Sequence, residues 1–479
     1  MCGAGHVGRD RETTRTQSSE GYRARCQAGY LLAYRPGCKG SRYFTKVQKP
    51  GKRLELGSGE NPEEREHFTK CDPWHAGYDY GGQHEIFPRT GTIAHWQMNC
   101  GFQTVIPSES PDSRAVTLIL CGDVMTGRGI DQILAQPSNP ALHERYVCSA
   151  LEYVEMAERA NGRIPRAAAF SYIWGDAIGE FDRLAAAARI VNLETSITTC
   201  EGYDPKGISY RMHPANTACL TAAKIDCCVL ANNHVMDWGR PGLGETLATL
   251  RAWGVKTAGA TCNRAEASKP AVIETGSVGR VLVFAAGTED SGIPPHWAAT
   301  DTDCGVALLS DLSDCTVEHI AGLVRAVKQP GDIAILSIHW GENWGYTIPA
   351  QQRTFAHRVM DHAGIDVIHG HSSHHPKGIE VYRGKPVLYG CGDFLNDYEG
   401  ISGYEEYRSH LVLMYCVKMD TVDGRLLALE MTPFEIKQFR LSYAPHECAQ
   451  WLLDTLHREG KRLDTEVVLS AANRLILQL

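Results

Sequence analysis

The feature that most constrains the fold is an alternation, from about Val116 onward, of short apolar runs with segments of helical pattern. The apolar runs have the length of buried strands, and they are AVTLILCGD, AARIVNLETS, AKIDCCVLANNH, RVLVFAAGT, DIAILSIHWGEN and IDVIHGHSSHHP. Helical patterns stand between them, as in RPGLGETLATLRAWG, TVEHIAGLVRAVKQ and PAQQRTFAHRVMDHAG. A mostly β tail follows, GIEVY, KPVLYGCGD, HLVLMYCVKM and RLLALEMTPFEI, before a helix around HECAQWLLDTLHRE. This order predicts an α/β domain with mixed sheets.

The chain divides into three parts by pattern. Residues 1–113 are rich in Gly, Pro, Arg and Ser and show no helical or strand period, so we predict a largely disordered N-terminal extension. A small accessory domain built on HFTKCDPWHAGYDYGG is the alternative for this part. Residues 114–436 form the predicted α/β domain. Residues 437–479 are expected to form a C-terminal helical segment packed on that domain.

The composition excludes several classes of protein. The hydrophobic fraction of 43% and the charged fraction of 22% are typical of a globular chain. A net charge of −8 does not favour nucleic acid as a partner, and no apolar run approaches the roughly 20 residues of a membrane span. The N-terminus lacks the apolar core of a secretory signal, and the 17 cysteines follow no framework spacing. We therefore expect a cytoplasmic protein, and the sequence leaves its oligomeric state open.

Polar side chains follow the apolar runs at the point where each predicted strand ends. In α/β sheets this edge gathers ligands and catalytic groups. Oxygen and nitrogen donors without cysteine suit a divalent metal such as Mn, Fe or Zn. Two of the four histidines in DVIHGHSSHHP, His369 and His375, are expected to face away from the site. The strand-end residues are Asp123, Glu194, Asn233, His234, His339, His371 and His374.

The motifs that carry these residues resemble the CapA family of bacterial capsule synthesis (poly-γ-glutamate biosynthesis) proteins. They are GDVMTGR, VNLETS, LANNHVMDWG, SIHWGENW and the stretch from GHSSHHPKG to GCGDFLNDYEGI, within residues 116–436. The family is similar to the calcineurin-like metallophosphoesterases. The resemblance implies a four-layer αββα sandwich with one or two divalent metal ions at the strand ends.

The resemblance also implies roles for single residues. Asp123 matches the first aspartate of the phosphoesterase pattern, Glu194 the bridging acidic residue and Asn233 a metal ligand. His234 matches the acid or transition-state stabiliser. The remaining implied metal ligands are His339, His371 and His374, with Glu342 as a further catalytic candidate and Trp340 and Asp393 as substrate contacts.

Three departures from the family patterns change the implied site. Met125 stands where the phosphoesterases have a histidine ligand, which puts one of two metal positions in doubt. Ser372 and Ser373 interrupt the usual G-H-H-P-H loop of the capsule family. Asp393 stands where that family usually has asparagine, and it could add a carboxylate to the site.

Three functions remain open on this evidence. The first is a metal-dependent hydrolase that cleaves a phosphoester or an amide bond of a polyglutamate-like chain. The second is a non-catalytic accessory protein of capsule or exopolymer assembly that binds an anionic polymer in the same cleft. The third is an α/β protein whose histidines only satisfy hydrogen bonds in the core.

Overall fold

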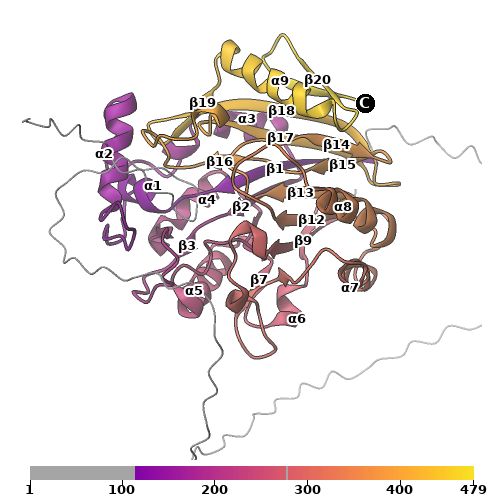
Figure 1. The fold of residues 1–479 in the computed structure, drawn as a ribbon, viewed down its shortest axis with the longest axis horizontal. Helices are drawn as coiled ribbons and strands as arrows, with labels where there is room; N and C mark the ends of the chain where they lie inside the picture. Colours follow the sequence, from indigo (N-terminus) through magenta and orange to yellow (C-terminus); the bar gives the residue numbers. More distant parts are fainter. Residues whose placement is uncertain (1–113, 277–278) are drawn as a thin grey trace, which may run out of the picture. The chain divides into compact units, whose positions relative to one another are not determined.

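The computed structural model describes residues 114–276 and 279–479, and its largest element is a ten-stranded sheet (Figure 1). The strand order is β20-β21-β18-β17-β1-β2-β5-β6, with β16 paired to the end of β1 and β19 paired to β18. Its central strand, β1, is parallel to β2 and β16 and antiparallel to β17. The strands are β1 (Ala115–Val124), β2 (Ala188–Leu193), β5 (Cys227–Val229), β6 (Lys256–Ala258), β16 (Asp393–Leu395), β17 (Leu411–Asp420), β18 (Leu426–Lys437), β19 (Arg440–Tyr443), β20 (Glu466–Leu469) and β21 (Leu475–Gln478).

A second sheet has seven strands in the order β11-β9-β12-β13-β15-β14, with β8 paired to β9. Its strands are β8 (Ala271–Glu274), β9 (Arg280–Thr288), β11 (Leu308–Leu309), β12 (Ile333–His339), β13 (Val367–His371), β14 (Ile379–Tyr382) and β15 (Lys385–Leu388). Two small sheets pair β3 (Ser196–Ile197) with β4 (Arg211–Met212), and β7 (Ala260–Thr261) with β10 (Gly305–Val306).

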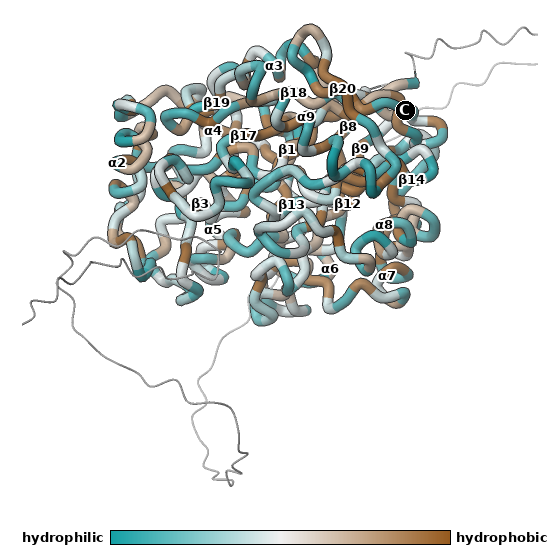
Figure 2. Tube along the Cα trace, turned by 45° about the horizontal axis from the view of Figure 1, so that its top comes forward, coloured by the Kyte–Doolittle hydropathy of each residue, from teal (hydrophilic) through white to brown (hydrophobic). Residues whose placement is uncertain are grey.

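Alternation along the strands builds the core. On β1, Leu118 and Leu120 belong to a buried cluster that holds residues of both large sheets, whereas Ile119 and Cys121 belong to a cluster shared with α1 to α5. Successive strand residues point to opposite faces, so each apolar run serves two cores. A third cluster joins the second sheet to α7 and α8. Figure 2 shows hydrophobic residues concentrated along central strands such as β18 and β9, with hydrophilic residues along the outer loops and helices.

The helices lie outside the sheets, and Figure 1 shows α7 and α8 together beside β9 and β12. Among them, α9 also contributes Leu452 and Leu456 to the cluster shared by both sheets. The helices are α1 (Arg128–Ile133), α2 (Ala150–Asn161), α3 (Ala177–Leu184), α4 (Ala218–Ala222), α5 (Gly239–Ala252), α6 (Arg264–Ala267), α7 (Asp314–Arg325), α8 (Ala350–His362) and α9 (His446–Gly460).

The prediction of an α/β domain with mixed sheets is confirmed. The sequence analysis missed β20 and β21, which follow α9 and extend the first sheet through the β21–β18 pair. The predicted N-terminal extension lies outside the described residues. Within the described part of the chain, no helix combines the length and apolar character that a membrane crossing requires.

Candidate metal centre

The strand-end residues of both large sheets meet in one buried cluster. Asp123 is paired with Asn192 across β1 and β2, and His339 with His371 across β12 and β13. The Nδ2 of Asn192 donates to Oδ1 of Asp123 over 2.6 Å, and the same oxygen lies 3.9 Å from Nδ1 of His371. The two sheets therefore contribute a carboxylate and imidazoles to one point. We call Asp123, Glu194, Asp393, His339, His371 and His374 the strand-end cluster.

Asp123, His339 and His371 form the first of two groups that could hold a metal ion among the described residues. Their ligand atoms lie within 4.8 Å of one another, and the two imidazole Nδ1 atoms are 2.8 Å apart. Burial lowers the pKa of His339 and of His371 well below the ordinary value. Both rings are therefore neutral near pH 7, which is the form that binds metal.

Asp123 is shared with the second group, which it forms with His374 and Asp393. Asp393 is paired with Asp123 between the parallel strands β16 and β1, and its Oδ1 lies 2.8 Å from Nδ1 of His374. Burial and the charge of Asp393 raise the pKa of Asp123 to about 7. Burial alone would lower the pKa of His374, but the charge and hydrogen bond of Asp393 raise it overall. The structure thus places Asp393, expected as a substrate contact, beside the predicted ligands.

Glu194 and Asn233 border the first group. Oε1 of Glu194 lies 3.9 Å from Nε2 of His339, and Oδ1 of Asn233 lies 3.2 Å from the same nitrogen. Oε2 of Glu194 is buried with no hydrogen-bond donor in reach among the described residues. Burial and the nearby charges of Asp123 and Asp393 raise the pKa of Glu194 well above its ordinary value. An orphaned carboxylate oxygen beside two more carboxylates and three imidazoles fits a divalent cation.

His234 is held by two residues outside the strand-end cluster. Its Nδ1 lies 2.8 Å from Oδ2 of Asp237 and 3.1 Å from Nζ of Lys206, and its Nε2 lies 3.8 Å from Oε1 of Glu194. Lys206 also donates to the carbonyl of Asn233 and lies 3.0 Å from Oδ1 of Asp237. Burial, and then the charge of Lys206, lower the pKa of His234 well below its ordinary value. The imidazole is therefore neutral, with Nε2 directed to the site.

A chain of two amides, Asn192 and Asn232, lies behind Asp123 and was not predicted as part of the site. Asn232 donates through Nδ2 to Oδ1 of Asn192 over 3.0 Å, and its own Oδ1 accepts from the backbone N–H of His234 at 3.1 Å. Asn192 stands two residues before Glu194 on the same strand face, so alternation was a signal that could have found it. Lys206 lies in the loop DPKG, where no pattern indicates a functional role.

The place of the absent histidine is apolar. Met125 is fully buried in a small cluster with Ile208, Tyr210 and Tyr398, and its Sδ accepts from the Tyr398 hydroxyl over 3.2 Å. The hydroxyl of Tyr210 donates in turn to that of Tyr398 over 3.3 Å. The thioether of Met125 and the phenol of Tyr398 thus occupy the place where the phosphoesterase pattern has a histidine.

Two expected positions differ in the structure. Trp340 does not face the cleft: it is 2% exposed, belongs to the third core cluster and donates through Nε1 to the carbonyl of Tyr389 over 3.0 Å. The expectation that His369 points away from His371 is wrong, because residues two apart on a strand share a face. His369 bonds the same Ser337 hydroxyl as His371. His375, by contrast, packs on Tyr346 and Tyr407.

A cavity of about 970 Å³ is lined by Asn233 and His234, which border the strand-end cluster. Glu342, a predicted catalytic residue, is exposed on its wall. The basic groups on the wall are those of His143, Arg145 and Lys206, and the ring of His143 stacks on Tyr203 with 3.6 Å between centroids. We call this space the site cavity, and it is large enough for several residues of a polymer.

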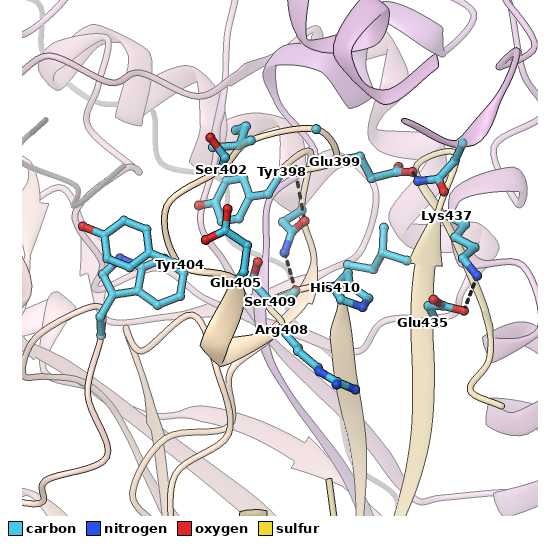
Figure 3. Close-up of a pocket in the computed structure, with 16 residues that line it drawn as sticks. Tyr398, Glu399, Ser402, Tyr404, Glu405, Arg408, Ser409, His410, Glu435 and Lys437 are labelled. Atoms are coloured by element: carbon cyan, nitrogen blue, oxygen red, sulfur yellow. Dashed lines mark hydrogen bonds and ion pairs between the residues drawn. The ribbon is translucent and has the colours of Figure 1, made fainter. Parts of the chain in front are cut away.

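A smaller pocket of about 300 Å³ adjoins the site cavity, with Trp344 and Tyr404 lining both (Figure 3). Its charged groups are largely committed to the fold. Glu399 accepts from the backbone N–H groups of Gln438 and Phe439 over 2.7 and 2.6 Å, and Lys437 pairs with Glu435 over 2.8 Å. This pocket is therefore built mainly from loop packing.

A second buried polar cluster lies close in sequence to the first, and we call it the arginine cluster. Arg128 is 2% exposed and follows Asp123 in the motif GDVMTGR. It donates through Nη2 and Nε to the two carboxylate oxygens of Asp397 over 2.5 and 3.1 Å, and Nη1 reaches Glu144 over 3.3 Å. Its guanidinium lies over the rings of Tyr153 and Tyr210. The ion pair of Arg128 with Asp397 joins the start of α1 to the loop after β16.

Comparison with known proteins identifies the family. The family model for the bacterial capsule synthesis protein PGA_cap matches residues 117–398. A probable polyglutamine synthesis accessory protein of Mycobacterium tuberculosis is 45% identical over 368 residues, which cover 76% of this chain and 96% of that protein. The PGA biosynthesis protein CapA of Bacillus subtilis is 27% identical over 66% of this chain and 70% of its own. The capsule biosynthesis protein CapA of Bacillus anthracis is 25% identical over 44% and 47%. The chain therefore belongs to the CapA (PGA_cap) family of bacterial capsule synthesis proteins, as its motifs predicted.

Proposed function

We propose that this protein is a metal-dependent hydrolase whose two large sheets and outer helices form the four-layer αββα sandwich of the calcineurin-like phosphoesterases. The observation that carries the proposal is the sharing of Asp123 by two buried groups of candidate ligands. A carboxylate placed between two such groups is suited to bridging a pair of cations. The shared core of the two sheets brings the groups together.

The residues of the cluster fit one or two divalent ions such as Mn, Fe or Zn. The first position would be held by Asp123, His339 and His371, and the second by Asp123, His374 and Asp393. Glu194 and Asn233 border the first position and complete its donors. Ions in such a site polarise a scissile carbonyl or phosphoryl group and lower the pKa of water. Besides the shared Asp123, the second position would take a carboxylate from Asp393, and it would take no ligand from Met125.

His234 is the side chain best placed to act on the leaving group. Its Nδ1 is oriented by Asp237 and Lys206, which leaves Nε2 directed to the site beside Glu194. A neutral imidazole in this position hydrogen-bonds a reacting oxygen or nitrogen and exchanges a proton with it. Glu342, on the wall of the site cavity, is the second candidate for proton transfer.

The substrate we propose is an anionic chain cleaved at an amide bond, or a phosphoester. The names of the relatives point to polyglutamine or PGA synthesis in those proteins. In this chain, the size of the site cavity supports a polymer, and Arg145 on its wall offers a partner for a carboxylate. The wall also carries the carboxyl groups of Asp204, Glu289, Asp290 and Glu342, and Lys206 is already paired with Asp237. Arg145 is exposed and makes no ion pair with another described residue, so it can meet an incoming carboxylate.

A non-catalytic accessory role in exopolymer assembly is the second candidate. Met125 in the place of a histidine favours it, because one expected ligand is absent from the site. The relative in Mycobacterium tuberculosis also carries the word accessory in its name. In this case the same cavity binds the polymer without cleaving it.

The deciding experiment measures metal content of the full chain by mass spectrometry, followed by hydrolysis assays with aryl phosphoesters and γ-glutamyl oligomers. We expect one or two equivalents of Mn, Fe or Zn in the wild type, lost in His371→Ala and Asp123→Ala. The matched control is His362→Ala on the exposed end of α8, which should keep its metal. Bound metal without turnover of either substrate class would favour the accessory role. A protein that stays metal-free after incubation with each ion would overturn the hydrolase.

A further inference from the structure

Two cysteines far apart in sequence occupy opposite positions of one antiparallel pair. The strands β7 and β10 pair Ala260 with Val306 and Thr261 with Gly305. One more step along the same register brings Cys262 opposite Cys304. No spacing motif in the sequence connects these two thiols, so only the register brings them together.

The hydrogen bonds of the ladder determine which kind of pair the cysteines form. The backbone N–H of Ala307 donates to the carbonyl of Gly259 over 2.8 Å, so these opposite residues form a hydrogen-bonded pair. Hydrogen-bonded and non-hydrogen-bonded pairs alternate along an antiparallel ladder. Counting from Gly259, Cys262 and Cys304 form a non-hydrogen-bonded pair, in which Cα atoms approach to about 4.5 Å. Disulfides span Cα separations of about 4.4 to 6.8 Å.

The two side chains are neighbours. Burial and the adjacent Cys262 thiol raise the pKa of the Cys304 thiol. Cys262 is exposed and Cys304 is partly buried, so an oxidant can reach the first thiol from solvent. Cys227 and Cys228, by comparison, are fully buried neighbours on β5 whose side chains point to opposite faces of the sheet.

We propose that Cys262 and Cys304 are a redox modification site that closes to a disulfide when a small-molecule disulfide such as oxidised glutathione is present. The Cys262 thiolate attacks the oxidant, forms a mixed disulfide and releases one glutathione thiolate. Cys304 then attacks the Cys262 sulfur, forms the intramolecular bond and releases the second glutathione. The two protein thiols are oxidised, one glutathione disulfide is reduced to two thiols, and the protons of the cysteines end on glutathione or in solvent.

The bond would fix one wall of the site cavity. The segment that it closes, residues 263–303, includes Asp290 and Gly292, which line the cavity. It also includes Trp297, whose Nε1 donates to Asp204 over 2.7 Å and whose ring lies 5.3 Å from Nζ of Lys206. Closing this loop reduces the conformational entropy of the unfolded chain. It also ties the segment that lines the cavity to the β7–β10 pair.

The test uses the full-length protein incubated with oxidised glutathione, followed by peptide mapping under non-reducing conditions. We expect a linked peptide pair containing Cys262 and Cys304, a mass lower by two hydrogens, and a melting temperature several degrees higher that dithiothreitol reverses. Cys262→Ser and Cys304→Ser should abolish both changes, whereas Cys315→Ser, which removes an exposed thiol on α7, should change neither. Stable glutathione adducts on Cys262 without the cross-link, or a link from Cys304 to another cysteine, would overturn the proposal. This outcome does not depend on whether the protein is a hydrolase.

Discussion

Two buried polar clusters begin in the same motif, GDVMTGR, and they differ in how their charges are balanced. In the arginine cluster, Arg128 faces the carboxylates of Asp397 and Glu144 and makes three hydrogen bonds to them. In the strand-end cluster, Asp123, Glu194 and Asp393 are gathered around imidazoles, two of which are held neutral by burial. The first cluster contains its own cation, and the second has three carboxylates and no arginine or lysine among its members.

This difference separates a structural role from a functional one. A buried carboxylate that is paired with an arginine is already satisfied and ties two loops together. A buried carboxylate whose pKa is raised is held at an energetic cost, which folded proteins tolerate where a ligand supplies the missing charge. Burial also raises the pKa of Glu144 in the arginine cluster, but there Arg128 supplies a balancing charge. We therefore infer that the arginine cluster links two segments of the fold and that the strand-end cluster destabilises the metal-free protein.

The largest expected effect on stability comes from breaking the arginine cluster. Arg128→Met keeps an apolar stem but leaves two buried carboxylates without their partner, which costs about 3–5 kcal/mol. We expect this loss in the free energy of unfolding measured with urea, or a failure to fold. A loss below about 1 kcal/mol would show that water reaches the cluster, and would remove the contrast between the two clusters.

Metal addition should act on the other cluster and in the opposite direction. An ion that binds only the folded state at a concentration 100 times its dissociation constant stabilises it by about 2.7 kcal/mol. We expect Mn²⁺ or Zn²⁺ to raise the melting temperature of the wild type and EDTA to reverse the increase. His371→Ala should lose this response, while Arg325→Ala, which removes an exposed ion pair with Glu318 on α7, should retain it. An equal response in both variants would place the ion elsewhere.

The pH dependence of the metal-free protein provides a third test. The folded protein holds the proton of Asp123 up to about pH 7, whereas the unfolded chain releases it near the ordinary pKa of 3.8. Folding is therefore progressively penalised as pH rises between these values, by about 2 kcal/mol in total after discounting for neighbouring charges. Asp123→Asn should remove this slope and be more stable than the wild type at pH 8. Unfolding curves of both proteins at pH 5, 6, 7 and 8 measure it, and parallel pH profiles would contradict the raised pKa.

The smallest expected effect lies where the two clusters meet. The ring of Tyr398 lies 5.5 Å from that of His374 and 6.0 Å from the guanidinium of Arg128, and it also packs on Met125. Tyr398→Phe removes its weak hydrogen bond to the sulfur and its contact with the Tyr210 hydroxyl, which together contribute less than about 1 kcal/mol. We expect a small decrease in the urea midpoint and unchanged metal content. Loss of bound metal in this variant would instead make the phenol part of the ligand set.

The sequence predicted much of the strand-end cluster because the carboxyl ends of parallel strands share an edge. Asp123, His339 and His371 each end an apolar run, which marked them as candidates. Asp123 lies in the first sheet and the two histidines in the second, so the packing of the two sheets is what brings the three together. Asp393 could not be placed in this way, because its position depends on β16 pairing with β1, far away in sequence. Trp340 was misjudged although alternation after His339 directs it to the opposite face, into the core.

The prediction of the strands was limited in a similar way, because some strands have no distinctive local pattern. Long apolar strands such as β1 and β12 were recognisable from composition, since they are buried on both faces. The short strands β20 and β21 were missed because they consist of four residues each and only alternate residues are buried. Lys206 was missed because it lies in a loop and its contacts are with residues that are distant in sequence. No local sequence pattern indicates such contacts.

The pairing of Asp123 with Asp393 also has a consequence for the order in which the protein is made. Some 270 residues separate the two strands, which at about 5–20 residues per second is roughly 15–50 seconds of synthesis. During that interval the ribosome has delivered β1 and β2 but neither β16 nor β17, so a nascent chain exposes the unpaired edge of its central strand. A chain halted before Asp393 carries all the donors of the first ligand group but lacks one donor of the second. The complete set of candidate ligands can therefore assemble only late in the synthesis of the chain.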